Sequence, residues 1–131
     1  MTRILLLGEG DFSFAYDLCQ VISQVNSCSD IVSVVATSFD ERIDLLKKYS
    51  SVEKHLDRLS RSVKFEVIHG VDATKSLKAQ LTDANCRSLV FDHVVFNFPH
   101  LGYEDMKVHS SLIAHIIHRL YISSITCTRQ L

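Results

Sequence analysis

This sequence contains no CxxC motif, no excess of basic residues and no long apolar run. Each of these absences argues against a class of protein. The four cysteines form no CxxC pair, so a zinc site is not expected. The formal net charge is −1, so the chain does not have the excess of lysine and arginine that a dedicated nucleic-acid module usually carries. No stretch approaches the roughly 18 apolar residues of a membrane span, and no secretory signal is present. We therefore expect an intracellular protein with reduced thiols and neither membrane nor metal partners.

The composition that is present is typical of a globular domain. Of the 131 residues, 47% are hydrophobic and 22% are charged, which suits one domain with its own core. Neither an internal repeat nor a low-complexity segment interrupts the chain. We therefore expect one domain over residues 1–120, followed by an atypical tail at residues 121–131.

Short apolar runs along the chain predict the strands of a sheet. Residues 3–8, 30–37 and 91–98 are rich in aliphatic and aromatic side chains and predict buried strands. Residues 63–69 alternate more between polar and apolar side chains and predict a strand nearer an edge. Strands of this kind, separated by helices, indicate an α/β fold with a parallel sheet and right-handed crossovers.

Apolar residues recurring at intervals of three and four predict the helices between these strands. The first stripe comprises Ala15, Leu18, Val21, Ile22 and Val25. The second comprises Leu45, Tyr49, Val52, Leu56 and Leu59. A break at Tyr49 is expected, since Ser50 and Glu53 have the spacing of a capping box. Further helices are predicted over residues 76–84 and 105–120.

The first predicted strand ends in a glycine-rich turn, Gly8–Asp11 (GEGD). Glycine permits positive φ and a close backbone approach, and the start of the following helix offers unpaired N–H groups. In this context the turn predicts a Rossmann-type cofactor loop, although the third glycine of the usual fingerprint is replaced by Ser13. The alternative is a plain strand-to-helix turn.

The acidic residues of this loop distinguish between cofactors. Glu9 and Asp11 would oppose a pyrophosphate but attract the ammonium and sulfonium charges of S-adenosylmethionine. The sequence therefore favours S-adenosylmethionine over NAD or ATP, with Asp11 as a helix cap left open as an alternative or additional role.

Carboxylates also follow two other predicted strands. Asp40 stands where such folds hold ribose hydroxyls, and it could equally be a helix N-cap. Asp72 follows the next strand along the chain, and its alternative role is a turn carboxylate bonded to its own backbone. Both are candidate cofactor-binding residues because the carboxyl ends of parallel strands meet at one edge of the sheet.

The strand at 91–98 leads into the sequence Asn97-Phe98-Pro99-His100. An asparagine at this edge can hydrogen-bond a planar base, Phe98 can stack on one, and His100 can accept a ring proton. The alternative is that proline, which has no N–H to donate, simply ends the strand.

Four motifs, in order, resemble one known family. They are LLLGEGDFSF from Leu5, ATSFD from Ala36, GVDAT from Gly70, and FD followed by FNFPH and Gly102 from Phe91. Together they are similar to the eukaryotic large-subunit rRNA uridine-N(3) methyltransferases, a domain also found in animal proteins with a ferredoxin-fold anticodon-binding domain. The similarity runs from about residue 4 to residue 120.

This resemblance implies a Rossmann-like fold and S-adenosylmethionine-dependent methylation of a uridine ring nitrogen in rRNA. Gly8, Glu9, Gly10 and Asp11 would hold the cofactor, with Asp40 and Asp72 near its ribose and adenine. Asn97, Pro99 and His100 would form the target-base side, with His100 as our hypothesis for the base. The implied setting is rRNA processing in ribosome biogenesis, in the nucleolus, nucleus or cytoplasm. We expect a monomeric enzyme that contacts large-subunit rRNA.

The family pattern continues beyond the helix at 105–120, whereas residues 121–131 show no family pattern. We therefore expect a domain truncated at its C-terminus. Two alternatives to a methyltransferase stay open: a non-catalytic module that binds RNA or a partner, and a nucleotide-binding oxidoreductase, which Glu9 and Asp11 disfavour.

Overall fold

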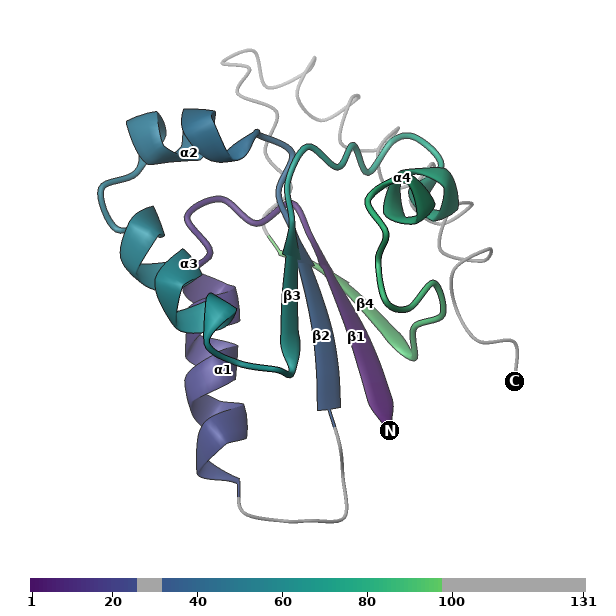
Figure 1. Ribbon diagram of the computed structural model, residues 1–131, viewed down its shortest axis with the longest axis horizontal. Helices are drawn as coiled ribbons and strands as arrows, with labels where there is room; N and C mark the ends of the chain where they lie inside the picture. Colours follow the sequence, from purple (N-terminus) through teal and green to yellow (C-terminus); the bar gives the residue numbers. More distant parts are fainter. Residues whose placement is uncertain (26–31, 98–131) are drawn as a thin grey trace.

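Strands and helices alternate along the described chain, which comprises residues 1–25 and 32–97 of the computed structural model (Figure 1). The elements are β1 Thr2–Leu7, α1 Ser13–Gln24, β2 Val32–Thr37, α2 Arg42–Lys48, α3 Val52–Ser60, β3 Phe65–Ile68, α4 Leu77–Asp83 and β4 His93–Phe96. All four predicted strands are confirmed, as is the predicted helix at 76–84. The helix predicted at 105–120 and the tail lie outside the described residues.

The described strands form one four-stranded sheet in the order β3-β2-β1-β4. Every pairing is parallel, with Leu5 of β1 lying beside Val35 of β2 and Val94 of β4. Among the described strands β3 pairs with β2 alone, which confirms its predicted position nearer an edge. The observed architecture is therefore the predicted α/β fold with a parallel sheet.

Alternate side chains of β1 enter two cores on opposite faces of the sheet. Leu6 packs with residues of α1, α2 and α3, whereas Leu5 and Leu7 pack with residues of α4. Figure 1 shows the same division, with α1 and α3 on one side of the sheet and α4 on the other. Each fully buried aliphatic side chain contributes roughly 1.5–3 kcal/mol, so both faces need helical cover.

Helix α1 buries a narrower face than its apolar stripe predicts. Ala15 and Cys19 are buried, but Val21 and Val25 are 57% and 60% exposed. Val21 lies in α1 and Val25 is its C-cap residue, and both are far more exposed than Cys19. The prediction for Val21 and Val25 was therefore wrong, because apolar spacing alone did not identify the side facing the sheet.

The predicted break in the second helical stripe is confirmed at Tyr49, which ends α2. The capping box is wrong, since α3 begins after Ser51 and no side chain caps it there. The Ser51 hydroxyl instead donates to the Asp11 carboxylate at 3.4 Å. A long-range contact has replaced the local one.

The described helices are short, the longest being the 12-residue α1, and none is long and apolar enough to cross a membrane. Within residues 1–25 and 32–97, no three His, Cys, Asp or Glu side chains are grouped to hold a metal ion. Cys19 and Cys86 are free thiols.

Candidate cofactor-binding and active site

The carboxyl ends of the four described strands bring most of the predicted site residues to one edge of the sheet. Gly8–Asp11 follow β1, Asp40 follows β2, Asp72 follows β3 and Asn97 follows β4. β1 lies between β2, the strand that follows it in the chain, and β4, so the strand order reverses between β1 and β4. Such a switch point is where open α/β sheets bind ligands.

Gly8 makes the sharp turn at the end of β1. Its φ is +67°, a left-handed conformation that favours glycine. A Cβ atom at this position would overlap the ring of Phe96 in the neighbouring strand β4. Gly8 is therefore required both by backbone conformation and by close packing between the two strands that flank the switch point.

Glu9 turns its side chain into the protein. Its backbone N–H donates to Thr37 O at 2.8 Å, and its carboxylate accepts from the Ala15 N–H at 3.4 Å. Burial raises the pKa of Glu9 to about 7; the Ala15 N–H opposes this rise and the charge of Asp11 adds to it. Glu9 therefore titrates near neutral pH at the N-terminus of α1.

Asp11 lies nearer the surface and is held by three groups. Its carboxylate accepts from the Ser13 N–H at 3.0 Å and from the Ser51 hydroxyl, and its carbonyl oxygen lies 2.7 Å from His55 Nδ1. Partial burial opposes ionisation, but the Ser13 hydrogen bonds, the His55 ring and Ser51 together lower the pKa of Asp11. Asp11 thus carries a full negative charge at neutral pH.

The two carboxylates replace a conventional cap on α1. Phe12, the N-cap residue, is fully buried with a φ of 61° and offers no side-chain hydrogen bond to the helix. Asp11 and Glu9 instead accept from the N–H groups of Ser13 and Ala15. The capping role considered for Asp11 is present, and Glu9 shares it, which the sequence did not indicate.

Asp40 lies between β2 and α2, at the carboxyl edge of the sheet as predicted. It is not a helix N-cap, since Glu41 occupies that position. Its carboxylate forms an ion pair with Lys48 at 2.8 Å. Its carbonyl oxygen accepts from the Ser38 hydroxyl at 2.8 Å and from the Gly70 N–H at 3.4 Å. The loops after β2 and β3 are therefore joined at Asp40.

Asp72 is engaged by its own loop. Its carboxylate accepts from the Thr74 N–H at 2.9 Å and the Thr74 hydroxyl at 2.6 Å. The backbone of Asp72 is also paired with the Gln80 side chain, through contacts at 2.7 and 2.8 Å. The alternative of a turn carboxylate is the arrangement observed.

Asn97 is partly exposed directly after β4, at the same edge as Gly8. Pro99 and His100 lie outside the described residues, as does Phe98. The assignment of the target-base side to Asn97, Pro99 and His100 stays a prediction.

Two histidines that the sequence did not single out contact loop residues at this edge of the sheet. His55 of α3 contacts the Asp11 carbonyl across 44 residues of chain, and His69 Nδ1 lies 2.7 Å from the Ser38 hydroxyl. Burial lowers the pKa of His69, as does the nearby Arg42. No local motif marks either histidine, since each acts on a residue from a distant part of the chain.

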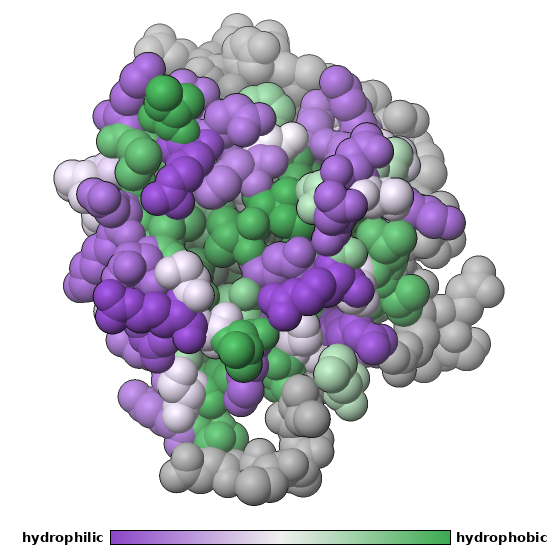
Figure 2. Space-filling view, in the orientation of Figure 1, coloured by the Kyte–Doolittle hydropathy of each residue, from purple (hydrophilic) through white to green (hydrophobic). Residues whose placement is uncertain are grey.

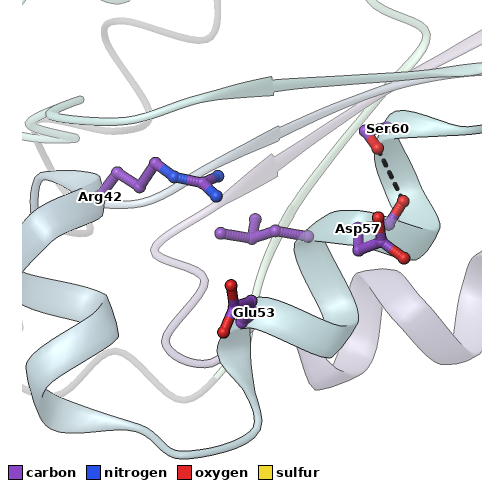
Figure 3. A pocket seen from close by; sticks show the side chains of 5 residues that line it. Arg42, Glu53, Asp57 and Ser60 are labelled. Atoms are coloured by element: carbon purple, nitrogen blue, oxygen red, sulfur yellow. Dashed lines mark hydrogen bonds between the residues drawn. The ribbon is translucent and has the colours of Figure 1, made fainter.

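A groove lies between α2, α3 and β3. One part, of about 250 Å³, is lined by Arg42, Glu53, Leu56, Asp57 and Ser60, and Figure 3 shows the Arg42 side chain extending from α2 toward α3. The adjoining part, of about 340 Å³, reaches His69 over apolar residues of α3 and β3. Figure 2 shows apolar side chains in this hollow, bordered by hydrophilic ones. Gly8–Asp11 do not line either part, so the groove is separate from the candidate cofactor loop.

Comparisons with known proteins identify relatives of this chain. The chain is 35% identical over 111 residues to heavy metal-associated isoprenylated plant protein 41 of Arabidopsis thaliana, covering 85% of this chain and 19% of that protein. It is 40% identical over 100 residues to the mouse ferredoxin-fold anticodon-binding domain-containing protein 1 homolog, covering 76% of this chain and 14% of that protein. It is 28% identical to the 25S rRNA (uridine(2634)-N(3))-methyltransferase of Saccharomyces cerevisiae, covering 76% of this chain and 32% of that protein.

The chain thus spans less than half the length of these curated relatives. No solved structure matches it. Residues 5–122 match the family described as rRNA (uridine-N3-)-methyltransferase, BMT5-like. The match covers most of the chain and includes the Gly8–Asp11 turn together with β2, β3 and β4, so the protein belongs to the BMT5-like methyltransferase family.

Proposed function

We propose that this chain binds S-adenosylmethionine at the Gly8–Asp11 loop and directs its methyl group to N(3) of a uridine in large-subunit rRNA. Family membership supports the reaction class, and the sheet places the loop at a switch point. The observation that carries the cofactor assignment is the charge of the loop. Two carboxylates and no cationic side chain lie between Gly8 and Phe12.

The charge of the loop suits a cationic cofactor. Asp11 is ionised at neutral pH and partly exposed, and Glu9 becomes ionised as the pH rises through about 7. At 4 Å, a unit charge of opposite sign gains roughly 4 kcal/mol at an effective dielectric constant of 20, whereas a phosphate is repelled by a similar amount. The ammonium and sulfonium groups of S-adenosylmethionine therefore fit this donor set better than a dinucleotide.

The backbone of the loop leaves room for a ligand. Gly10 is exposed, and among the described residues a Cβ placed on it would meet only the Tyr49 side chain, whose hydroxyl would lie 3.4 Å away. We assign Gly8, Glu9, Gly10 and Asp11 to the cofactor, with Asp40 near its ribose and Asp72 near its adenine. Asp40 would exchange its ion pair with Lys48, a partner that is more than half exposed, for ribose hydroxyls.

S-adenosylmethionine supplies an electrophilic methyl group when it is bound. N(3) of uridine carries a proton, and the nitrogen is a poor nucleophile until that proton leaves. We assign proton removal to His100, and we assign Asn97 and Pro99 with it to the target-base side of the site. We further propose that the chain acts as a monomer on rRNA in the nucleolus, nucleus or cytoplasm.

Gly10→Arg is expected to abolish binding of labelled S-adenosylmethionine, because it places a bulky cation where the cofactor's own positive groups should lie. The measurement is calorimetric or filter-binding titration of the full 131-residue chain. Val63→Arg is the matched control, since it adds the same side chain at a site that is 87% exposed before β3, away from the loop. Absence of binding by the unmodified chain would contradict the cofactor assignment.

The second candidate function is a non-catalytic module that binds RNA or a partner. Methyl transfer from labelled cofactor to rRNA purified from cells lacking the enzyme separates the two. Transfer supports catalysis, whereas RNA binding that is independent of cofactor and without transfer supports the module.

A further inference from the structure

Helix α3 contacts the cofactor loop through two polar side chains. His55 Nδ1 lies 2.7 Å from the backbone carbonyl oxygen of Asp11, and the Ser51 hydroxyl lies 3.4 Å from its carboxylate. The two residues are one helical turn apart at the start of α3, which packs beside the start of α1 (Figure 1). Asp11 is therefore held at both its backbone and its side chain by one helix.

The chemistry of the contact fixes the role of His55. A carbonyl oxygen can only accept a hydrogen bond, so Nδ1 must carry the proton and donate it. The ring is 9% exposed and lies against Tyr16 of α1, with ring centroids 4.8 Å apart. Because the ring is enclosed and oriented in this way, the donor is fixed in direction toward the loop.

The carbonyl that His55 holds belongs to the peptide bond before Phe12. Phe12 is a non-glycine residue at a φ of 61°, a left-handed conformation that is unfavourable for a side chain and needs support from its surroundings. The Phe12 ring is fully buried and meets His69 edge-on, with ring centroids 5.6 Å apart. The Asp11–Phe12 peptide is thus fixed on one side by packing and on the other by His55.

We infer that His55 and Ser51 are positioning residues, which set the conformation of the Gly8–Asp11 loop for the cofactor without touching it. The cofactor part of this inference rests on the proposed function. The structural part, that His55 restrains the loop in the free protein, is independent of any ligand. The two parts can therefore be measured separately.

Two substitutions at position 55 separate hydrogen bonding from packing. His55→Asn keeps an N–H donor close to the position of Nδ1 but loses the ring, whereas His55→Phe keeps a ring against Tyr16 but loses the donor. If His55 acts through its hydrogen bond, the phenylalanine variant should bind S-adenosylmethionine about 10- to 100-fold more weakly, and the asparagine variant within about threefold of the unmodified chain. A packing role predicts the reverse order.

Hydrogen exchange in the absence of cofactor provides the second measurement. Amides of residues 9–13 should exchange about tenfold faster or more in His55→Phe than in His55→Asn, because the loop opens locally once its restraint is removed. Ser51→Ala, at the more exposed start of α3, should give a smaller increase and leaves the buried ring in place. Amides of β2 serve as the internal reference for global unfolding.

The outcomes are distinguishable. Faster loop exchange in His55→Phe together with weaker cofactor binding supports the whole inference. If the unmodified chain fails to bind S-adenosylmethionine, the proposed function fails, while the exchange data still decide whether His55 restrains the loop. Equal loop exchange in His55→Phe and His55→Asn, or a larger effect from asparagine, overturns the positioning role.

Discussion

Gly8→Ala is expected to destabilise the chain by about 2–4 kcal/mol, the sum of a left-handed backbone penalty and of overlap with a packed neighbour. The φ of +67° is unfavourable for alanine, and its Cβ would enter the space of the Phe96 ring. The two penalties act together because Gly8 lies where β1 and β4 separate. Urea unfolding followed by circular dichroism measures the change.

Gly10→Ala is the matched control for this prediction. It adds the same methyl group two residues along the loop, where the nearest atom to the new Cβ would be the Tyr49 hydroxyl at 3.4 Å. Its effect on stability should stay within about 1 kcal/mol. Equal destabilisation by the two alanines would mean that the conformation and packing at Gly8 are not what the structure indicates.

The contrast between these glycines shows how far the sequence could predict the site. The GEGD turn after an apolar run predicted a loop at the end of a strand, and that loop is present between β1 and α1. The sequence did not distinguish a glycine required by its conformation, Gly8, from one that leaves open surface, Gly10. That difference depends on Phe96 and Tyr49, which come from β4 and the end of α2.

The elements of the fold were predictable because periodicity is a local property. The strands and the break at Tyr49 follow from apolar spacing and were confirmed. The partners of polar side chains were not predictable, since Ser51 and His55 lie 40 and 44 residues from the Asp11 atoms they contact. Local rules assigned Ser50 and Glu53 to a capping box, and the tertiary contact from Ser51 took precedence.

The polar residues at the carboxyl edge of the sheet differ in whether they stabilise the free chain. Asp72 bonds its own turn and Asp40 pairs with Lys48, so both have structural roles in the free chain. Glu9 differs because it is buried, and burial disfavours the charged form of its carboxylate. A group that destabilises the free protein at neutral pH is a stronger indication of function than one that stabilises it.

Glu9→Gln is expected to stabilise the free chain above pH 7 by about 2–3 kcal/mol, with the gain disappearing as the pH falls to about 4.5. The pKa of Glu9 is about 7 in the folded state against an ordinary value of 4.5. Between these values the folded chain binds a proton that the unfolded chain has released, so stability falls as the pH rises. Glutamine keeps an oxygen that can accept from the Ala15 N–H and has no charge to desolvate.

The measurement is urea unfolding of both chains at pH 5 and pH 8, taken as the difference between variant and unmodified protein. Glu53→Gln is the control, since it removes an exposed carboxylate from the first turn of α3 and should shift stability by less than about 1 kcal/mol, and equally at both pH values. A gain from Glu9→Gln that is the same at pH 5 and pH 8 would contradict the raised pKa.

The same substitution should weaken S-adenosylmethionine binding by about tenfold or more at pH 8, equivalent to about 1.4 kcal/mol, because a cationic ligand loses one of two carboxylates. In the unmodified chain a bound cation favours ionised Glu9, so affinity should rise as the pH increases from 6 to 8. Glu9→Gln should remove most of this pH dependence. Gained stability with unchanged affinity would leave Glu9 as a costly helix cap and assign the attraction for the cofactor to Asp11 alone.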